Sequence, residues 1–265
     1  MHNRPKRVVV IGGTGLIGTR LAARLQLDGH DVIATSPASG VNTVSGDGLW
    51  EVLEDAEVVI DVANAPSFEA EVALAFFSTA GRNLIAAGRS QRIAHHVALS
   101  VVGADRLVES GYFRAKLEQE SIVRASDVPY TILRATQFME FMPRLATSGG
   151  DSRLVRVALA LTQPIAADDV AVALATIAAG EPVNDIVEVA GPEAYRLSDV
   201  VGRVLANASD DRLVIADSNA RYLGARLGER TLIPGPAPLT GSTLFDAWLS
   251  RTRAQATSNV GELRS

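Results

Sequence analysis

A short apolar strand followed directly by a glycine-rich turn constrains this chain more than any other feature. Val8-Val9-Val10-Ile11 is a run of four β-branched residues, typical of a buried strand. The turn Gly12-Gly13-Thr14-Gly15-Leu16-Ile17-Gly18 follows, and the apolar spacing of a helix continues after it. The glycines fit both G-x-G-x-x-G and G-x-x-G-x-x-G, which place phosphates on the helix N-terminus. A purely architectural glycine turn is the alternative; its place directly after an apolar strand favours nucleotide binding.

Strand and helix patterns alternate along the first half of the chain. The apolar segments predict strands at residues 31–35, 41–44, 58–63, 97–101 and 130–133. Helical spacing predicts helices at residues 49–53, 67–88 and 111–125. Because such alternation implies right-handed βαβ units, we expect an α/β fold, a doubly wound parallel sheet of the Rossmann type.

The alternation of strand and helix patterns becomes less regular after about residue 150. We expect a dinucleotide-binding Rossmann domain at 1–150, a smaller C-terminal substrate lobe at 151–250 and a polar tail at 251–265. The strand predicted at 186–190 returns to the main sheet in this interpretation. Further helices are predicted at 168–179, 197–206 and 244–249, and Asp168-Asp169 is expected to cap the first of them.

Composition narrows the function classes. The chain has no cysteine, which excludes thiol catalysis, and its four histidines disfavour a histidine-rich metal site. A net charge of −5 disfavours nucleic acid as the main partner. Charged residues and proline interrupt the apolar stretches, so no membrane span is expected. We therefore expect a cytoplasmic protein, monomeric or homodimeric, that acts on a small molecule and holds no metal.

The end of the second predicted strand bears on the choice of cofactor. NAD-binding units place an acidic residue there for the ribose hydroxyl, whereas this chain has Thr35-Ser36-Pro37-Ala38-Ser39. The missing carboxylate favours NADP over NAD, with Thr35, Ser36 and Ser39 as hydroxyl donors to the additional phosphate. Arg20 is either its counter-charge or a solvated helix residue. Asp47 and Ala63-Asn64-Ala65 follow predicted strands, where the adenine half is expected.

A Tyr-x-x-x-Lys pattern opens the helix predicted at 111–125. Tyr112 and Lys116 lie four residues apart and so share a helical face. An adjacent ammonium lowers the pKa of a phenol, which suits a proton donor for carbonyl reduction, and Lys116 can also reach the cofactor's ribose. Ser100 ends a predicted strand and is expected to bind the substrate carbonyl. The alternative is a buried aromatic residue beside a surface cation.

Gly12–Gly18, Ser100, Tyr112-x-x-x-Lys116 and Leu133-Arg134-Ala135-Thr136-Gln137-Phe138 together resemble the short-chain dehydrogenase/reductase superfamily, in particular its atypical NmrA-like branch. The resemblance covers about residues 6–190. It implies that Asn83 joins the catalytic set and that Ala135, Thr136, Gln137 and Phe138 lie near the nicotinamide and the substrate. The interval between Ser100 and Tyr112 is shorter than the superfamily's usual one.

These residues together predict an NAD(P)-dependent oxidoreductase that transfers hydride to a carbonyl or quinone-like small molecule. Ser100, Tyr112, Lys116 and Asn83 form the predicted catalytic set. Many NmrA-like proteins lack the tyrosine and bind the dinucleotide without catalysis, so a non-catalytic NAD(P)-sensing protein is the alternative. The presence of Tyr112 favours the enzyme.

Overall fold

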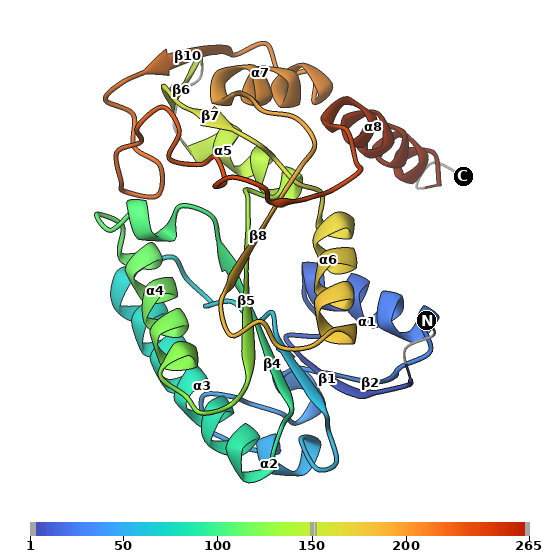
Figure 1. Cartoon of the computed structure of the whole chain (residues 1–265). Coiled ribbons are helices and arrows are strands. Elements are labelled where there is room, and N and C mark those ends of the chain that lie inside the picture. Colours follow the sequence, from blue (N-terminus) through green and yellow to red (C-terminus); the bar gives the residue numbers. More distant parts are fainter. Residues whose placement is uncertain (1–3, 149–150, 152, 263–265) are drawn as a thin grey trace.

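The chain folds around one seven-stranded, all-parallel sheet in the order β11-β8-β5-β4-β3-β1-β2 (Figure 1). The computed structural model describes residues 4–148, 151 and 153–262. The strands are β1 (Arg7–Ile11), β2 (Asp31–Thr35), β3 (Val58–Asp61), β4 (His95–Val101), β5 (Tyr130–Ala135), β8 (Ile186–Ala190) and β11 (Leu239–Thr240). Apart from the short edge strand β11, they are rich in buried apolar residues, as a sheet covered on both faces requires.

Helices cover both faces of this sheet. They are α1 (Leu16–Leu27) and α6 (Ala167–Ala179) on one face, and α2 (Leu49–Val52), α3 (Ala70–Ser90) and α4 (Gly111–Arg124) on the other. Alternate residues of β1 serve the two layers: Val8 and Val10 pack with α1 and α6, and Val9 and Ile11 pack with α2 and α3. The predicted α/β fold with a doubly wound parallel sheet is confirmed.

The strand order reverses at β1, because β2 lies on one side of it and β3 on the other. Such a switch point leaves a crevice at the carboxyl ends of the strands. The prediction of a strand at residues 41–44 is wrong, because this segment forms a turn. The side-chain oxygen of Asn42 accepts hydrogen bonds from the N–H groups of Val44 and Ser45, which competes with strand pairing.

A smaller lobe lies over the carboxyl ends of the strands (Figure 1). It contains two short sheets, β6 (Leu154–Ala158) with β10 (Leu213–Asp217) and β7 (Leu161–Thr162) with β9 (Tyr195–Arg196). Its helices are α5 (Met142–Ser148), α7 (Leu197–Asn207) and α8 (Phe245–Glu262). One hydrophobic cluster contains Phe77 of α3 and Phe113 of α4 together with Val200 and Phe245 of the lobe. The lobe and the helices α3 and α4 therefore share a core.

Two expectations for the second half require correction. Asp168 and Asp169 lie in the first turn of α6 and do not cap it; Asp168 pairs with Arg20 at 2.9 Å, and Glu140 accepts the N–H of Ala167. The helix predicted at 244–249 continues to Glu262 as α8, because the expected tail contains strong helix formers such as arginine and alanine. The expected boundary at residue 150 and the end of the tail at 263–265 lie outside the described residues.

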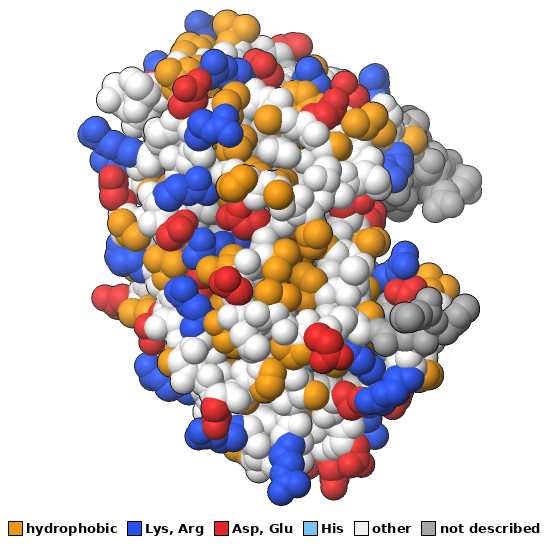
Figure 2. Space-filling view, viewed as in Figure 1, with side chains coloured by type: hydrophobic (Ala, Val, Ile, Leu, Met, Phe, Trp, Pro, Cys, Tyr) orange, Lys and Arg blue, Asp and Glu red, His pale blue; other side chains and the backbone are white. Residues whose placement is uncertain are grey.

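Charges of both signs intermingle over the face seen in Figure 2, and apolar side chains gather near its middle, in the region of β8 and α6. The described residues drawn there form no continuous basic surface. The helices of the described ranges include none with the length and apolarity that a bilayer crossing requires.

Candidate active site

A cleft of about 580 Å³ lies at the switch point, along the carboxyl ends of β1, β3 and β4. It brings together residues from both halves of the predicted site. From the cofactor set it is lined by Gly12, Thr14, Gly15, Leu16, Ile17, Ser36, Ala63 and Asn64, and from the catalytic and substrate set by Ser100, Tyr112, Lys116 and Phe138. Residues separated by more than a hundred positions in the sequence therefore face one continuous space.

The glycine turn forms the floor of this cleft at the N-terminus of α1. A Cβ at Gly18 would lie 2.2 Å from the carbonyl oxygen of Gly12, and one at Gly13 would lie 2.7 Å from the Cβ of Ala34, so both glycines allow close backbone packing. Gly12 has a φ of +82°. A Cβ at Gly15 would meet only the Gly12 oxygen, at 3.2 Å. Gly15 therefore leaves its space to whatever approaches from the cleft, as a phosphate-binding turn requires.

The hydroxyl groups predicted to bind the additional phosphate of NADP differ in availability. Thr35 donates to the carbonyl of Val10 at 3.4 Å, and Ser39 donates to the carbonyl of Ser36 at 2.9 Å. The Ser36 hydroxyl is buried, lines the cleft and has no partner among the described residues. The glycine turn and this orphaned hydroxyl fit a dinucleotide.

Two other predicted cofactor contacts are corrected by the structure. Arg20 does not line the cleft, because its guanidinium donates to Asp168 and to the carbonyl of Leu16. Asp47 accepts a hydrogen bond from Ser45 at 2.6 Å in the turn after β2, while Asn42 and Thr43 line the cleft in its place. Ala65 lines a neighbouring surface hollow beside Arg144. The turn at 41–48 therefore presents different residues from those expected.

Tyr112 lies on the wall of the cleft, where α4 begins. Its hydroxyl donates to the side-chain oxygen of Asn64 at 3.0 Å, and its ring packs edge-on against Phe68 with centroids 4.7 Å apart. Burial raises the pKa of Tyr112 to about 12, and the hydrogen bond to Asn64 opposes this shift. The expectation that Lys116 lowers this pKa is wrong in this structure. The phenol instead stays protonated near neutral pH.

Lys116 is held beneath Tyr112 by a buried polar network that sequence reasoning missed. Its ammonium donates to the carbonyl of Leu99 at 2.8 Å and to the side chain of Gln119, which in turn donates to Asp61 at 2.8 Å. The ammonium also lies 4.4 Å from the centroid of the Phe77 ring. Burial lowers the pKa of Lys116 to about 8, which the carboxylates of Asp61 and Glu120 partly oppose. The sequence could have predicted these neighbours, because Gln119 and Glu120 follow Lys116 by three and four residues and so share its helical face.

Ser100 belongs to a second buried network. Its hydroxyl donates to Glu120 at 2.6 Å, and Glu120 is paired with Arg134, whose guanidinium also reaches Asp105 at 3.1 Å. The Ser100 proton is therefore committed to a carboxylate, and the hydroxyl oxygen retains its capacity to accept a hydrogen bond. The predicted donation from Ser100 to a substrate carbonyl requires the hydroxyl to leave Glu120. Asn64, expected only as a cofactor contact, takes the place beside Tyr112.

Asn83, which the resemblance places in the catalytic set, is not among the residues that line the cleft. Its side-chain nitrogen donates to the carbonyls of Thr43 and Val44, at 2.9 and 3.0 Å. These bonds attach the turn after β2 to the middle of α3. The role of Asn83 in this structure is to hold the turn whose residues Asn42 and Thr43 line the cleft.

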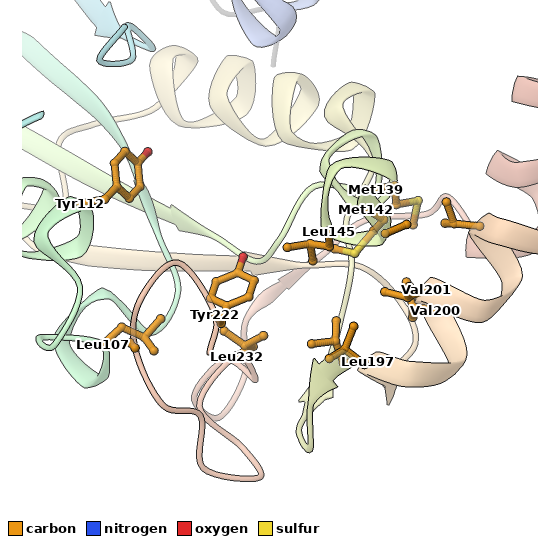
Figure 3. Packing of buried hydrophobic residues seen from close by; sticks show 14 of the residues in the cluster. Leu107, Tyr112, Met139, Met142, Leu145, Leu197, Val200, Val201, Tyr222 and Leu232 are labelled. Carbon is orange, nitrogen blue, oxygen red and sulfur yellow. The ribbon is translucent and has the colours of Figure 1, made fainter. Parts of the chain in front are cut away.

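A smaller chamber of about 130 Å³ adjoins the cleft at Tyr112, Asn64 and Ser100. The end of β5 and the residues after it, Ala135, Thr136, Gln137 and Phe138, form one wall. The lobe contributes Tyr222 and Leu223 from the loop after β10. Figure 3 shows Tyr112 and Tyr222 on separate elements, α4 and this loop. The lining is mostly apolar and aromatic, and it includes no charged side chain among the described residues. Tyr222 was missed because the loop that carries it has no periodic pattern.

Comparison with known proteins agrees with a dinucleotide site at the glycine turn. A family model described as NAD(P)H-binding matches residues 12–181. A search of curated proteins finds no match.

Solved structures match almost the whole chain at low identity. dTDP-4-dehydrorhamnose reductase from Bacillus anthracis, in complex with NADP, is 15% identical with a TM-score of 0.70, covering 94% of this chain and 98% of that one. A short-chain dehydrogenase/reductase superfamily protein from Agrobacterium tumefaciens with bound NAD is 14% identical, with a TM-score of 0.72 and coverage of 97% and 99%. UDP-N-acetylglucosamine 4-epimerase from Bacillus cereus is 17% identical, with a TM-score of 0.69 and coverage of 94% and 99%.

Proposed function

The chain belongs to the NAD(P)H-binding family, and we propose that it is an NADP-preferring oxidoreductase of the atypical short-chain dehydrogenase/reductase type. It acts, in this proposal, on the carbonyl group of a small uncharged molecule. One observation carries this proposal. The glycine turn at α1 and the hydroxyl of Tyr112 face the same cleft. A molecule as long as a dinucleotide, with its phosphates on the turn, has the room to extend toward Tyr112.

Each group of the cleft has a role in this proposal. The turn Gly12–Leu16 holds the pyrophosphate, the hydroxyl of Ser36 binds the phosphate that distinguishes NADP, and Lys116 binds the ribose next to the nicotinamide. When bound, the nicotinamide supplies or accepts a hydride. Asn64 is set to orient the phenol of Tyr112, because the side-chain oxygen of Asn64 accepts its proton at 3.0 Å.

Tyr112 serves as the proton donor to the oxygen of the reduced carbonyl. A phenol with a pKa of about 12 is protonated at neutral pH, and it is a stronger acid than the alcohol that forms when it protonates the alkoxide. Asn64 is the neighbour that can shift from accepting this proton to donating its own amide hydrogens to the substrate oxygen. The described residues that line the chamber beside Tyr112 include no charged side chain, which supports an uncharged substrate.

The proposal is tested with Tyr112→Phe, which keeps the ring contacts with Phe68 and removes the hydroxyl. We expect NADPH oxidation on a panel of carbonyl and quinone compounds to fall by about 10²–10⁴-fold, while NADPH affinity changes little. Tyr130→Phe is the matched control. Tyr130 is the first residue of β5 and therefore lies at the amino-terminal ends of the strands, whereas the cleft lies at their carboxyl ends. Equal turnover of Tyr112→Phe and the parent protein would refute the role of this phenol.

One observation favours a second candidate, a dinucleotide-sensing protein without turnover. Ser100 and Tyr112 do not combine as a carbonyl-binding pair, since Ser100 donates to Glu120 and Tyr112 donates to Asn64. A sensor predicts NADPH binding in the parent protein with no oxidation on any compound of the panel. The same assay therefore separates the two functions.

A further inference from the structure

The chamber beside Tyr112 contains two buried polar atoms that the protein leaves without hydrogen bonds. They are the hydroxyl oxygen of Thr136 and the side-chain nitrogen of Gln137, each on a residue more than nine-tenths buried. Both residues line the chamber. A buried donor without a partner destabilises a fold, so such atoms are retained where a bound molecule completes them.

The surroundings fix what these two atoms can bind. The side-chain oxygen of Gln137 accepts a hydrogen bond from Thr162 at 3.1 Å, so its nitrogen is the free end and can only donate. Backbone hydrogen bonds hold both residues in place, from the N–H of Thr136 to Val189 and from that of Ile165 to the carbonyl of Gln137. Two residues of the chamber wall, held in place by these bonds, therefore each have a donor that is available to an oxygen atom that accepts hydrogen bonds.

The chamber's size and lining limit the molecule that carries this oxygen. A volume of about 130 Å³ is close to the ~150 Å³ cavity that accepts a single benzene ring. The rings of Phe113, Phe141 and Tyr222 line it and offer flat apolar contacts. A compound with one six-membered ring matches this space.

We propose that the substrate is an uncharged single-ring carbonyl compound with a second oxygen across the ring, and that Thr136 and Gln137 bind this second oxygen. This inference rests on the proposed function. The reacting C=O bond takes a hydride at carbon, supplied by NADPH, and a proton at oxygen from Tyr112, giving an alcohol and NADP⁺. The second oxygen does not react and sets the orientation of the ring.

Cyclohexane-1,4-dione and cyclohexanone test this inference, because the rings are alike and only the dione has the second carbonyl. We expect kcat/KM of the parent protein for the dione to exceed that for cyclohexanone by about tenfold. Thr136→Val should remove most of this difference, because it should raise KM for the dione more than it raises KM for cyclohexanone. Thr136→Ser, which keeps the hydroxyl, should retain the preference.

The Thr136→Val substitution is suited to this test because the hydroxyl it removes has no partner in the fold. Its melting temperature should equal or exceed that of the parent protein. Equal use of both compounds by the parent, or an equal loss with both in Thr136→Val, would overturn the inference while the oxidoreductase proposal stands.

A binding measurement separates this inference from the proposed function. Saturation-transfer NMR on the protein with NADP⁺ reports ring binding without turnover. Preferential binding of the dione by the parent, lost in Thr136→Val, would support the recognition by Thr136 even if no compound is reduced. Equal binding of both compounds would overturn it.

Discussion

The two halves of the cleft are built in different ways. The phosphate-binding part of the cofactor half comes from one continuous segment, Val8–Gly18, whose backbone forms a strand, a turn and the start of a helix. The substrate half combines residues from five separate places: Asn64 after β3, Ser100 on β4, Tyr112 on α4, Thr136 after β5 and Tyr222 in the lobe. The first half therefore depends on backbone geometry at glycines, and the second on how distant elements pack.

This difference extends to electrostatics. The glycine turn Gly12–Gly18 contains no titratable side chain, and in the proposed function its backbone N–H groups at the helix N-terminus bind the phosphates. The substrate half instead lies over the buried ionisable groups Asp61, Lys116, Glu120 and Arg134. Substitutions in the first half should act on binding, and those in the second on turnover and on the pH dependence of stability.

The largest expected effect is at Gly15, in the cofactor half. Gly15→Asp places a carboxylate where the pyrophosphate binds, and like-charge contact of several kcal/mol should weaken NADPH binding roughly thousandfold. Calorimetry measures the affinity. Gly15→Ala is the control for folding, because a Cβ there meets only the Gly12 oxygen at 3.2 Å and the residue has an ordinary φ of −80°. Unchanged affinity in Gly15→Asp would show that phosphates do not bind at this turn.

In the substrate half, Lys116 should make stability depend on pH. Burial lowers its pKa to about 8 from 10.5, so between these values the unfolded chain binds a proton that the folded protein has released. The free energy of unfolding should therefore rise with pH across this window, by up to about 3 kcal/mol. Tyr112 acts in the opposite direction above pH 10, because its folded pKa is raised to about 12.

Denaturant unfolding of the parent protein and Lys116→Met at pH 7.5 and 9.5 measures this contribution. The rise should be about 2 kcal/mol larger in the parent. An equal change in both proteins would show that Asp61 and Glu120 fully compensate the burial of the ammonium.

The same contrast explains how much the sequence could predict. The sheet, the glycine turn and the positions of Tyr112 and Lys116 follow from local patterns, because strand, turn and helix periods are properties of short segments. The partners of these residues depend on packing between distant elements, which periodicity does not contain. Ser100 was predicted to bind a carbonyl, and its bond to Glu120 arises only when α4 packs against β4. The turn at 41–44 was misread because Asn42 satisfies the backbone there.

A smaller effect concerns the choice between NADPH and NADH. We expect the parent protein to bind NADPH about tenfold more tightly, about 1.4 kcal/mol, through one charge-assisted hydrogen bond from Ser36. Ser36→Asp should reverse the preference, since a carboxylate at the end of β2 binds the ribose hydroxyl of NADH and repels the phosphate. Ser36→Ala separates loss of the hydroxyl from added charge. Equal affinities of the parent for both dinucleotides would show that Ser36 does not bind the additional phosphate of NADPH.

The smallest expected effect on turnover is at Asn83, where the resemblance and the structure disagree. The resemblance implies a catalytic role, whereas the structure has the side chain attached to the carbonyls of Thr43 and Val44. Asn83→Ala should therefore lower the free energy of unfolding by about 1–2 kcal/mol, the net value of two hydrogen bonds. Turnover per folded molecule should stay within about twofold, because no reacting group is removed.

Asn83→Asp sharpens this prediction, because a carboxylate has the shape of the amide but cannot donate to either carbonyl. It should destabilise the protein at least as much as Asn83→Ala, since two carbonyl oxygens then face a negative charge. A fall in kcat of a hundredfold or more in Asn83→Ala, with the fold intact, would place Asn83 in the substrate half after all. Loss of stability alone would confirm that Asn83 supports the turn on the cofactor side and takes no part in the reaction.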